Sequence, residues 1–227
     1  MYIHFFKRLM DFTLALLALV ILSPLFIPIS ILLLLTGEHY IFYTQKRVGK
    51  GGREFGLIKF ATMLKNSPNL GTGDVTVNRD PRVLPMGRFL RSTKINELPQ
   101  LLNILLGDMS FVGPRPLTPK VFNHYTEAAK EIVTQMKPGL TGAGSIIFRD
   151  EESVIGRSKL PWDECVKQEI MPRKAAAEKW YYTHQGFITD ILLIFITAWV
   201  VVFPASDIMG KIFRDLPKEP AASLTNI

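Results

Sequence analysis

The side chains that could do chemistry gather between residues 79 and 116. Arginines lie beside proline or glycine turns at Asp80-Pro81-Arg82, Gly87-Arg88-Phe89-Leu90-Arg91 and Gly113-Pro114-Arg115-Pro116. Arginine offers a planar fork of donors that matches phosphate oxygens, and glycine lets backbone amides approach an anion closely. Glu97 lies in the same stretch, where a carboxylate could hold Mg²⁺ or act as a base. The pattern indicates a phosphate site, although contact with anionic lipid headgroups accounts for the arginines equally well.

The composition of the chain agrees with an anionic partner. The 227 residues are 48% hydrophobic and 21% charged, which excludes a disordered or collagen-like protein. The net charge is +7 and the mean hydropathy is +0.18. Residues 41–100 hold eleven basic and four acidic side chains, so the whole excess of positive charge lies there. The single cysteine, Cys165, excludes an intrachain disulfide and a cysteine-based metal site.

One uncharged segment is long enough to enter a membrane. Phe12 to Thr36 contains 25 residues without a charge, and Ser23-Pro24 interrupts it at its middle. Basic residues flank both ends, which favours the cytoplasmic side for both. We therefore expect residues 1–38 to form a re-entrant helix that breaks near Ser23 and Pro24. A single kinked span is the alternative.

The remaining pattern predicts a mostly helical α+β protein. Residues 39–185 are expected to form a cytosolic catalytic domain with amphipathic interfacial helices, residues 186–204 an apolar interfacial or packed helix, and residues 205–227 a C-terminal extension. Within the catalytic domain we expect a β-hairpin from Tyr40–Val48 and Arg53–Leu64, and helices at Ser92–Leu106, Val121–Met136 and Pro172–Thr183. Pro99 should kink the first of these helices or delay its start.

A series of ordered motifs resembles the bacterial sugar transferase family, the monotopic phosphoglycosyl transferases. The motifs are Lys7-Arg8-Leu9-Met10-Asp11, Ser23-Pro24, Gln45-Lys46-Arg47-Val48-Gly49, Lys59-Phe60, Glu97-Leu98-Pro99-Gln100, Gly107-Asp108-Met109-Ser110, Gly113-Pro114-Arg115-Pro116 and Lys137-Pro138-Gly139-Leu140-Thr141-Gly142. The resemblance covers about residues 4 to 200.

The resemblance implies a reaction and its surroundings. A sugar-1-phosphate would pass from a UDP-sugar to a polyprenol phosphate such as undecaprenyl phosphate, with release of UMP and a requirement for Mg²⁺. The protein would enter one leaflet of the bacterial inner membrane from the cytosolic face. Downstream glycosyltransferases and a second copy of the chain are further expected partners, and nucleic acid is not. The sugar and the glycan pathway stay open.

The resemblance also implies roles for individual residues. Glu97 would be catalytic and would hold Mg²⁺, while the contacts to phosphate and uridine would come from Lys59, Arg88, Arg91, Arg115 and Arg149.

Three departures from the family pattern bear on the mechanism. Asn96 stands where the family has its nucleophilic aspartate, Lys59-Phe60 is followed by Ala61 instead of arginine, and Ser145–Arg149 differs from the usual Gln-x-Asn-Gly-Arg. One interpretation is that Glu97 acts as the nucleophile, or as a base in direct transfer to the acceptor. A second is that one of the carboxylates at Asp150, Glu151 and Glu152 replaces the aspartate. An inactive membrane scaffold for glycan assembly is the third possibility.

Overall fold

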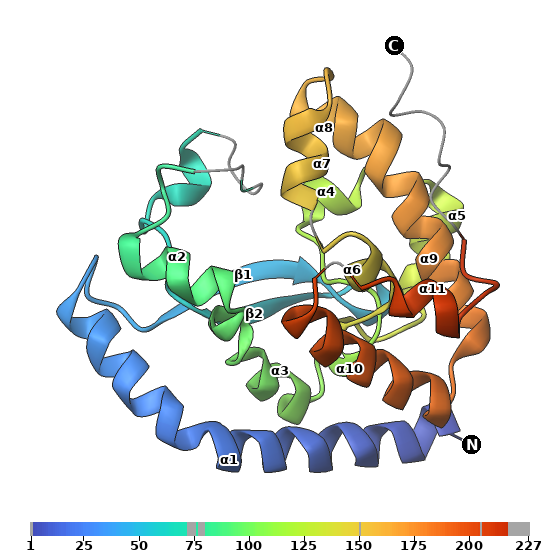
Figure 1. The fold of residues 1–227 in the computed structure, drawn as a ribbon, viewed down its shortest axis with the longest axis horizontal. Coiled ribbons are helices and arrows are strands. Elements are labelled where there is room, and N and C mark those ends of the chain that lie inside the picture. The colour runs from blue at the N-terminus through green and yellow to red at the C-terminus, as the bar shows by residue number, and fades with distance from the viewer. Residues whose placement is uncertain (1, 72–75, 77–79, 150, 205, 218–227) are drawn as a thin grey trace.

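One long apolar helix and a body of shorter elements make up the described chain. The computed structural model describes residues 2–71, 76, 80–149, 151–204 and 206–217. Helix α1 (Lys7–Leu35), preceded by a short π-helix at Tyr2–Phe6, extends along one side of the body (Figure 1). The prediction of a mostly helical protein with a small hairpin is confirmed.

Helix α1 is the helix within the described ranges that is long and apolar enough to cross a membrane. It stays helical through Pro24 and Pro28, so the predicted break at Ser23 and Pro24 is a bend instead. Figure 1 shows a level limb followed by a rising limb. Pro24 has no N–H to offer the carbonyl of Val20, but the Ser23 hydroxyl donates to that carbonyl at 2.8 Å. This replacement of the missing donor explains why the helix continues.

Both limbs of α1 pack on the same body. Ala15 is buried against the core that contains Leu57 and Leu101, while Ile29 and Leu33 pack in the core of Phe60 and Leu90. The outward face between these contacts is apolar and exposed, at Leu16, Leu17, Val20, Ile21, Leu25 and Ile27. So many exposed apolar side chains on one helix are unusual for a surface that contacts water alone.

A buried polar network fastens the first turn of α1. Lys7 forms an ion pair with Asp190, which has no exposed surface. The hydroxyls of Tyr2 and Tyr181 donate to the same carboxylate at 2.7 and 2.6 Å. One turn later, Asp11 accepts hydrogen bonds from the Ser110 hydroxyl and the Phe111 amide, both at 3.0 Å. The network therefore ties α1 to the start of helix α10 and to strand β3.

The predicted hairpin is confirmed. Strands β1 (Phe42–Val48) and β2 (Glu54–Phe60) pair antiparallel, with Tyr43 opposite Lys59 and Val48 opposite Glu54. Gly51 and Gly52 adopt φ values of 69° and 73° in the connecting turn, a conformation that glycine reaches without strain.

The helix predicted at Ser92–Leu106 has the delayed start that Pro99 predicted, and it does not include Ser92. Ser92 is the last residue of α2 (Pro85–Ser92), a 3₁₀ turn follows at Ile95–Glu97, and α3 (Gln100–Leu106) begins directly after Pro99. Lys94 separates these elements because its φ of 60° lies in the left-handed region, which ends a helix.

The predicted helix at Val121–Met136 is interrupted. The structure has α4 (Pro119–Phe122) and α5 (Glu127–Thr134) in its place. The Thr126 hydroxyl accepts a hydrogen bond from the Ala129 amide, so a new helix begins at Glu127. Apolar periodicity runs across this boundary and conceals it.

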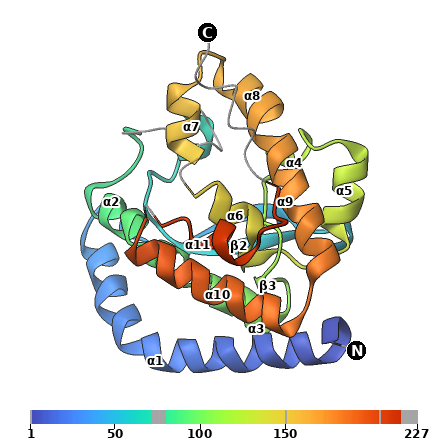
Figure 2. The same cartoon turned by 45° about the vertical axis from the view of Figure 1, so that its right-hand side comes forward.

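The remaining elements cover the hairpin and α3 (Figures 1 and 2). Strands β3 (Ser110–Val112) and β4 (Gly139–Thr141) pair parallel. The helices that follow are α6 (Ala143–Ile147), α7 (Glu151–Arg157), α8 (Trp162–Cys165), α9 (Met171–His184), α10 (Phe187–Val202) and α11 (Ile208–Ile212), with a π-helical stretch at Val166–Ile170 before α9. Helix α9 confirms the predicted helix that begins near Pro172.

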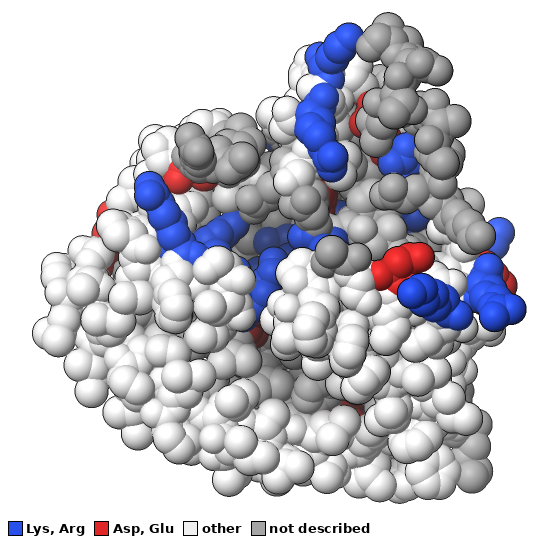
Figure 3. Space-filling model, in the orientation of Figure 1, with Lys and Arg blue, Asp and Glu red and all other residues white. Residues whose placement is uncertain are grey.

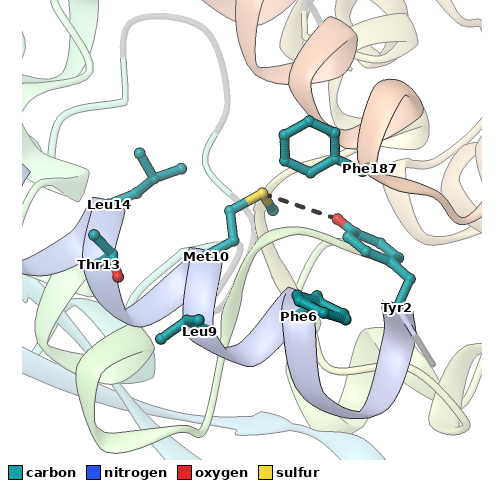
Figure 4. A pocket seen from close by; sticks show the side chains of 7 residues that line it. All are labelled: Tyr2, Phe6, Leu9, Met10, Thr13, Leu14 and Phe187. Carbon is teal, nitrogen blue, oxygen red and sulfur yellow. Dashed lines mark hydrogen bonds between the residues drawn. The ribbon is translucent and has the colours of Figure 1, made fainter.

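Helix α10 is packed on one face only. Asp190, Leu193, Ile196 and Val200 are buried, whereas the opposite face exposes Ile188, Ile191, Phe195, Trp199 and Val202. A cavity of about 520 Å³ lies between its first residue and the start of α1, lined by Tyr2, Phe6, Leu9, Met10, Thr13, Leu14 and Phe187 (Figure 4). Its lining is almost wholly apolar, which suits hydrocarbon and not a phosphate group.

The buried ion pair between Lys7 and Asp190 generates a stability prediction. Asp190→Ala leaves the Lys7 ammonium buried without a counter-charge, and we expect the free energy of unfolding to fall by about 3–5 kcal/mol. The double variant Lys7→Met/Asp190→Leu removes both charges and should recover part of this loss, because the Tyr2 and Tyr181 hydroxyls still lose the carboxylate to which they donate. Denaturant unfolding in detergent micelles measures both. A single variant as stable as the wild type would contradict this account of the network.

Candidate active site

Three separate segments bring one carboxylate and two cations together. Lys59 Nζ on β2 lies 3.1 Å from Glu97 Oε1, and Arg115 Nη2 in the loop after β3 lies 3.4 Å from the same oxygen. Figure 3 shows Lys and Arg side chains gathered in a hollow at the centre of this face of the molecule. The sequence prediction that Lys59, Glu97 and Arg115 share a site is consistent with this geometry.

A side chain on α3 joins this helix to the strand that carries Lys59. Asn103 Oδ1 accepts a hydrogen bond from the Ile58 amide at 3.0 Å, and Asn103 Nδ2 donates to the Gly56 carbonyl at 2.8 Å. Asn103 is almost fully buried, so these bonds do not compete with water. The edge of β2 is thereby tied to the helix that directly follows the Glu97 turn.

The Arg115 loop is held by close backbone contacts. A Cβ atom on Gly113 would lie 2.2 Å from the Lys137 carbonyl, so glycine is required there. The Gly139 amide donates to the Pro114 carbonyl at 2.8 Å, and Arg47 Nη1 donates to the Pro116 carbonyl at 3.1 Å. Proline on both sides of Arg115 further restricts the backbone.

The charges at this site alter each other's protonation. Burial alone would raise the pKa of Glu97, but Lys59, Arg115 and Lys94 outweigh it and hold that pKa well below its usual range. Burial lowers the pKa of Lys59 to about 8, with Arg115 and Arg47 adding to the effect and Glu97 opposing it. Glu97 is therefore an anion at every physiological pH, whereas Lys59 titrates close to neutrality.

The two oxygens of Glu97 are not equivalent. Both cations contact Oε1, and Oε2 makes no hydrogen bond to the described part of the chain. The side chain keeps 15% of its surface exposed, so a ligand can reach it.

Asn96 is buried next to Glu97, and its Oδ1 has no hydrogen-bond partner in the described chain. A buried carbonyl oxygen without a partner is costly in a folded protein. The structure thus places one free carboxylate oxygen and one free amide oxygen on consecutive residues.

Three predicted phosphate contacts do not bind Glu97 in the structure. Arg91 Nη1 contacts Met63 Sδ at 3.8 Å, while Arg88 and Arg149 are exposed. Within the described residues, none of these arginines forms an ion pair or hydrogen bond with Glu97. Arg82, from the same arginine-rich stretch, is buried in an ion pair with Asp80 and donates hydrogen bonds to the carbonyls of Ser67 and Leu70. Its role is therefore structural.

Of the three carboxylates after Arg149, the structure describes the side chain of Glu151. Its Oε2 forms an ion pair with Lys174 at 2.6 Å. Asp150 and the Glu152 side chain lie outside the described residues.

Four further charged residues act on the cluster and were not predicted: Arg47, Lys94, Lys174 and Glu178. Arg47 and Gln45 lie on the same side of β1, where both are partly buried. The motif that contains Arg47 was found in the sequence, but no role was assigned to this residue. Lys174 and Glu178 share the buried stripe of α9 with Met171, Ala177 and Tyr181. The sequence signal that could have found Lys174 and Glu178 is their spacing, which places them on the same helix face as buried apolar residues.

Comparison with known proteins assigns the family. The family model described as bacterial sugar transferase matches residues 2–204. The chain belongs to the bacterial sugar transferase family. The match includes α1, the hairpin, the Glu97 cluster and α10.

Individual members of the bacterial sugar transferase family are similar to this chain over different lengths. The exopolysaccharide production protein ExoY of Sinorhizobium fredii is 38% identical over 66% of this chain and 73% of its own length. The undecaprenyl-phosphate galactose phosphotransferase of Salmonella typhimurium is 32% identical over 88% of this chain and 41% of its own. The UDP-glucose:undecaprenyl-phosphate glucose-1-phosphate transferase of Xanthomonas campestris is 36% identical over 64% and 31%. The chain thus spans less than half the length of two of these relatives.

The lowered pKa of Lys59 generates a prediction for anion binding in this bacterial sugar transferase. Lys59 loses its charge as the pH rises through about 8, so the affinity for inorganic pyrophosphate should fall there. In Lys59→Arg the guanidinium keeps its proton, and the decline should vanish. Isothermal titration calorimetry between about pH 6.5 and 9.5 measures both, and ionisation of the ligand cancels in the comparison. The same decline in both proteins would show that another group titrates.

Proposed function

We propose that this protein transfers a sugar-1-phosphate from a UDP-sugar to undecaprenyl phosphate or a similar polyprenol phosphate, with release of UMP. The observation that carries the proposal is the Glu97 carboxylate, held between Lys59 and Arg115 in a basic hollow of a protein with an exposed apolar helix. A diphosphate donor needs the cations, and a lipid acceptor needs the apolar surface. The names of the Salmonella and Xanthomonas relatives support this reaction.

Glu97 is proposed as the nucleophile and not as a general base. A carboxylate whose pKa is held far below neutrality is a poor proton acceptor. The acceptor phosphate is already deprotonated, so the transfer requires no base. Asn96 has a neutral amide and cannot take the nucleophilic role. The free Oε2 of Glu97 is the oxygen that can attack, because both cations contact Oε1.

The proposed reaction has two displacements. In the first, Glu97 Oε2 forms a bond to the sugar-bearing phosphorus, the bond from phosphorus to the bridging oxygen breaks, and UMP leaves with the electron pair. In the second, an oxygen of the polyprenol phosphate forms a bond to the same phosphorus, and the bond to Glu97 breaks. Lys59 and Arg115 offset the repulsion between the anionic nucleophile and the anionic donor.

A Mg²⁺ ion fits this arrangement. No group of three histidine, cysteine or acidic side chains lies together in the described chain, so a closed protein cage for a metal is not found there. Mg²⁺ commonly uses one or two protein oxygens together with substrate phosphates and water. The unpartnered Asn96 Oδ1 and the neighbouring Glu97 would hold it. When bound, the ion supplies positive charge to the diphosphate.

The outer arginines are proposed as contacts to the nucleotide. Arg88 and Arg149 are exposed, so an anion in solution has access to both. The galactose and glucose named for the relatives define the first donors to test for this chain, UDP-galactose and UDP-glucose.

We also propose that α1 enters and leaves the membrane on one side. Its two limbs pack on the same body, and a helix that crossed the bilayer would carry its far end away from that body. Apolar residues of α1 between these two contacts are exposed. This arrangement brings the Glu97 cluster to the level of lipid phosphates on the cytosolic face of the inner membrane.

Nothing in the structure or the relatives supports the inactive alternative. A scaffold without catalysis has no need for a buried carboxylate whose charge is maintained by two cations, since such an arrangement carries a desolvation penalty.

The reaction is tested by UMP release from UDP-galactose and UDP-glucose with undecaprenyl phosphate and Mg²⁺ in detergent. We expect turnover by the wild type and a loss on the order of a thousandfold or more in Glu97→Gln. Glu54→Gln, an exposed carboxylate of the hairpin, is the matched control and should stay active. Full activity of Glu97→Gln would exclude the nucleophile. An inactive wild type that Asn96→Asp activates would show that catalysis has been lost.

The membrane arrangement is tested by single cysteines placed beyond each end of α1. Ile3→Cys and Thr36→Cys both introduce an exposed thiol, and the native Cys165 is buried. A maleimide that cannot cross membranes should label both positions in inverted vesicles and neither in intact spheroplasts. Labelling of the two positions from opposite sides would establish a spanning helix and contradict the proposal.

A further inference from the structure

Two cations that the proposed reaction does not use lie over the turn that ends α3. Gly107 forms this turn with a φ of 95°. A Cβ atom placed on Gly107 would lie 3.4 Å from Arg8 Nη2 and 3.6 Å from Lys137 Nζ. The two charged nitrogens therefore lie within about 7 Å of each other. Like charges at that separation repel, so the position favours an anion.

Arg8 is held over the end of α3 by uncharged partners. Its Nη1 donates to the Ile104 carbonyl at 2.6 Å, and its Nη2 donates to the Leu105 carbonyl at 2.7 Å. These bonds satisfy carbonyls of the last helical turn and fix the guanidinium without neutralising it. Within the described residues, Arg8 and Lys137 form no ion pair with a carboxylate.

Lys137 reaches the same turn from the loop before β4. The Ser110 amide donates to the Pro138 carbonyl at 2.9 Å, which fixes the backbone directly after Lys137. The ring of Pro138 restricts this backbone further. The Lys137 side chain is partly exposed, so a ligand outside the protein can reach it.

The charges around Lys137 also favour an anion. Burial lowers the pKa of Lys137, and the positive charges of Arg8 and Lys50 add to the effect. Asp11 and Asp108 oppose it but do not reverse it. Asp11 in addition already accepts hydrogen bonds from β3, so it is not a counter-ion dedicated to Lys137.

The turn at Gly107 borders apolar surface. Helix α3 lies along α1, with Leu101 and Ile104 in the same core as Ala15 (Figures 1 and 2). Leu106, directly before Gly107, has 74% of its surface exposed, and Phe12 is exposed with its ring centroid 5.9 Å from Arg8 Cζ. Two cations beside exposed hydrocarbon suit a ligand whose phosphate is attached to apolar chains.

This position is separate from the Glu97 cluster. Glu97 precedes α3 and Gly107 follows it, and seven helical residues span about 10 Å. The reacting phosphates of the donor and the acceptor are assigned to Glu97. A phosphate at the Gly107 turn therefore belongs to a different molecule.

We infer that Arg8 and Lys137 bind the phosphate group of an anionic membrane phospholipid over the Gly107 turn. Charge-assisted hydrogen bonds of about 2.7–2.9 Å to separate oxygens let one phosphate span both nitrogens. The acyl chains lie against the apolar surface beside Phe12 and Leu106. The bound headgroup holds the first turns of α1 at the level of the lipid phosphates. This site goes beyond the proposed reaction and does not require it.

The test measures lipid binding by the full-length protein in detergent micelles. Native mass spectrometry counts the dioctanoyl phosphatidylglycerol molecules that the protein retains as the lipid concentration is raised. Dioctanoylglycerol has the same chains without the phosphate. Lys137→Gln removes one cation, and Lys137→Arg keeps it. Lys167→Gln is the matched control, because Lys167 is an exposed lysine that follows α8, a helix on the opposite side of the molecule from α1 (Figure 1).

We expect the wild type to retain phosphatidylglycerol and not dioctanoylglycerol. Lys137→Gln should weaken the affinity by about tenfold or more, since it removes a charge-assisted hydrogen bond. Lys137→Arg and Lys167→Gln should stay close to the wild type. Binding of undecaprenyl phosphate should not depend on Lys137, and inorganic phosphate, which has no chains, should not displace the phospholipid.

A second measurement needs no variant. An acetylating ester modifies accessible lysines of the wild type, and mass spectrometry locates them. Phosphatidylglycerol at about ten times its dissociation constant should slow the modification of Lys137 by about tenfold and leave Lys167 unchanged.

Unaltered phosphatidylglycerol binding in Lys137→Gln, or a Lys137 that the lipid does not protect, would overturn the inference. Equal retention of dioctanoylglycerol would also overturn it, because the phosphate would then not be recognised. Loss of undecaprenyl phosphate instead of phosphatidylglycerol in Lys137→Gln would assign the site to the acceptor and exclude a phospholipid site. Neither measurement uses UMP release, so failure of the proposed function would leave both results valid.

Discussion

The site depends on one electrostatic constraint: a single carboxylate must remain charged inside the protein while an anionic substrate approaches it. Two cations on Glu97 Oε1 meet the first requirement, because their attraction outweighs the desolvation of Glu97. The same cations meet the second, because they also attract phosphate. In the proposed mechanism the free Oε2 is the reactive atom, and the replacement of the family's aspartate by Asn96 does not remove the anion from the site.

This constraint determines what the fold must position. Lys59, Glu97 and Arg115 come from a strand, a 3₁₀ turn and a loop, and each is fixed by its own buried contact. Asn103 aligns β2 with α3, and Asp11 fastens β3, the strand that leads into the Arg115 loop, to α1. The long apolar helix is therefore part of the framework of the site.

Local patterns predicted the hairpin and α9, because alternation and helical periodicity are visible within a few residues. The position of Asn96 and Glu97 in the site was predicted from the motif Glu97-Leu98-Pro99-Gln100 that the chain shares with the family. Apolar periodicity failed at Asn123–Thr126, where Thr126 begins a new helix by accepting the Ala129 amide. It also failed at Lys94, whose left-handed backbone nothing nearby in the sequence indicates. Local capping and backbone geometry prevailed over the longer apolar pattern in both places.

Contacts between distant residues were beyond reach of the sequence. Glu97 meets Lys59 across 38 positions, and the stripe of α9 shows that Glu178 is buried without showing which residues surround its carboxyl group. Arg88, Arg91 and Arg149 show the opposite case. Arginine is a residue type that binds phosphate well, yet none of the three contacts Glu97 within the described residues.

The most direct test of the central claim is to look for the bond that Glu97 is proposed to form. The wild type is incubated with a UDP-sugar that it turns over, without polyprenol phosphate, then quenched in acid and digested for mass spectrometry. The account predicts a sugar-phosphate adduct on Glu97, lost on addition of the acceptor and absent from Glu97→Gln. Steady turnover with no adduct on Glu97 at any time, or an adduct on a different residue, would contradict it.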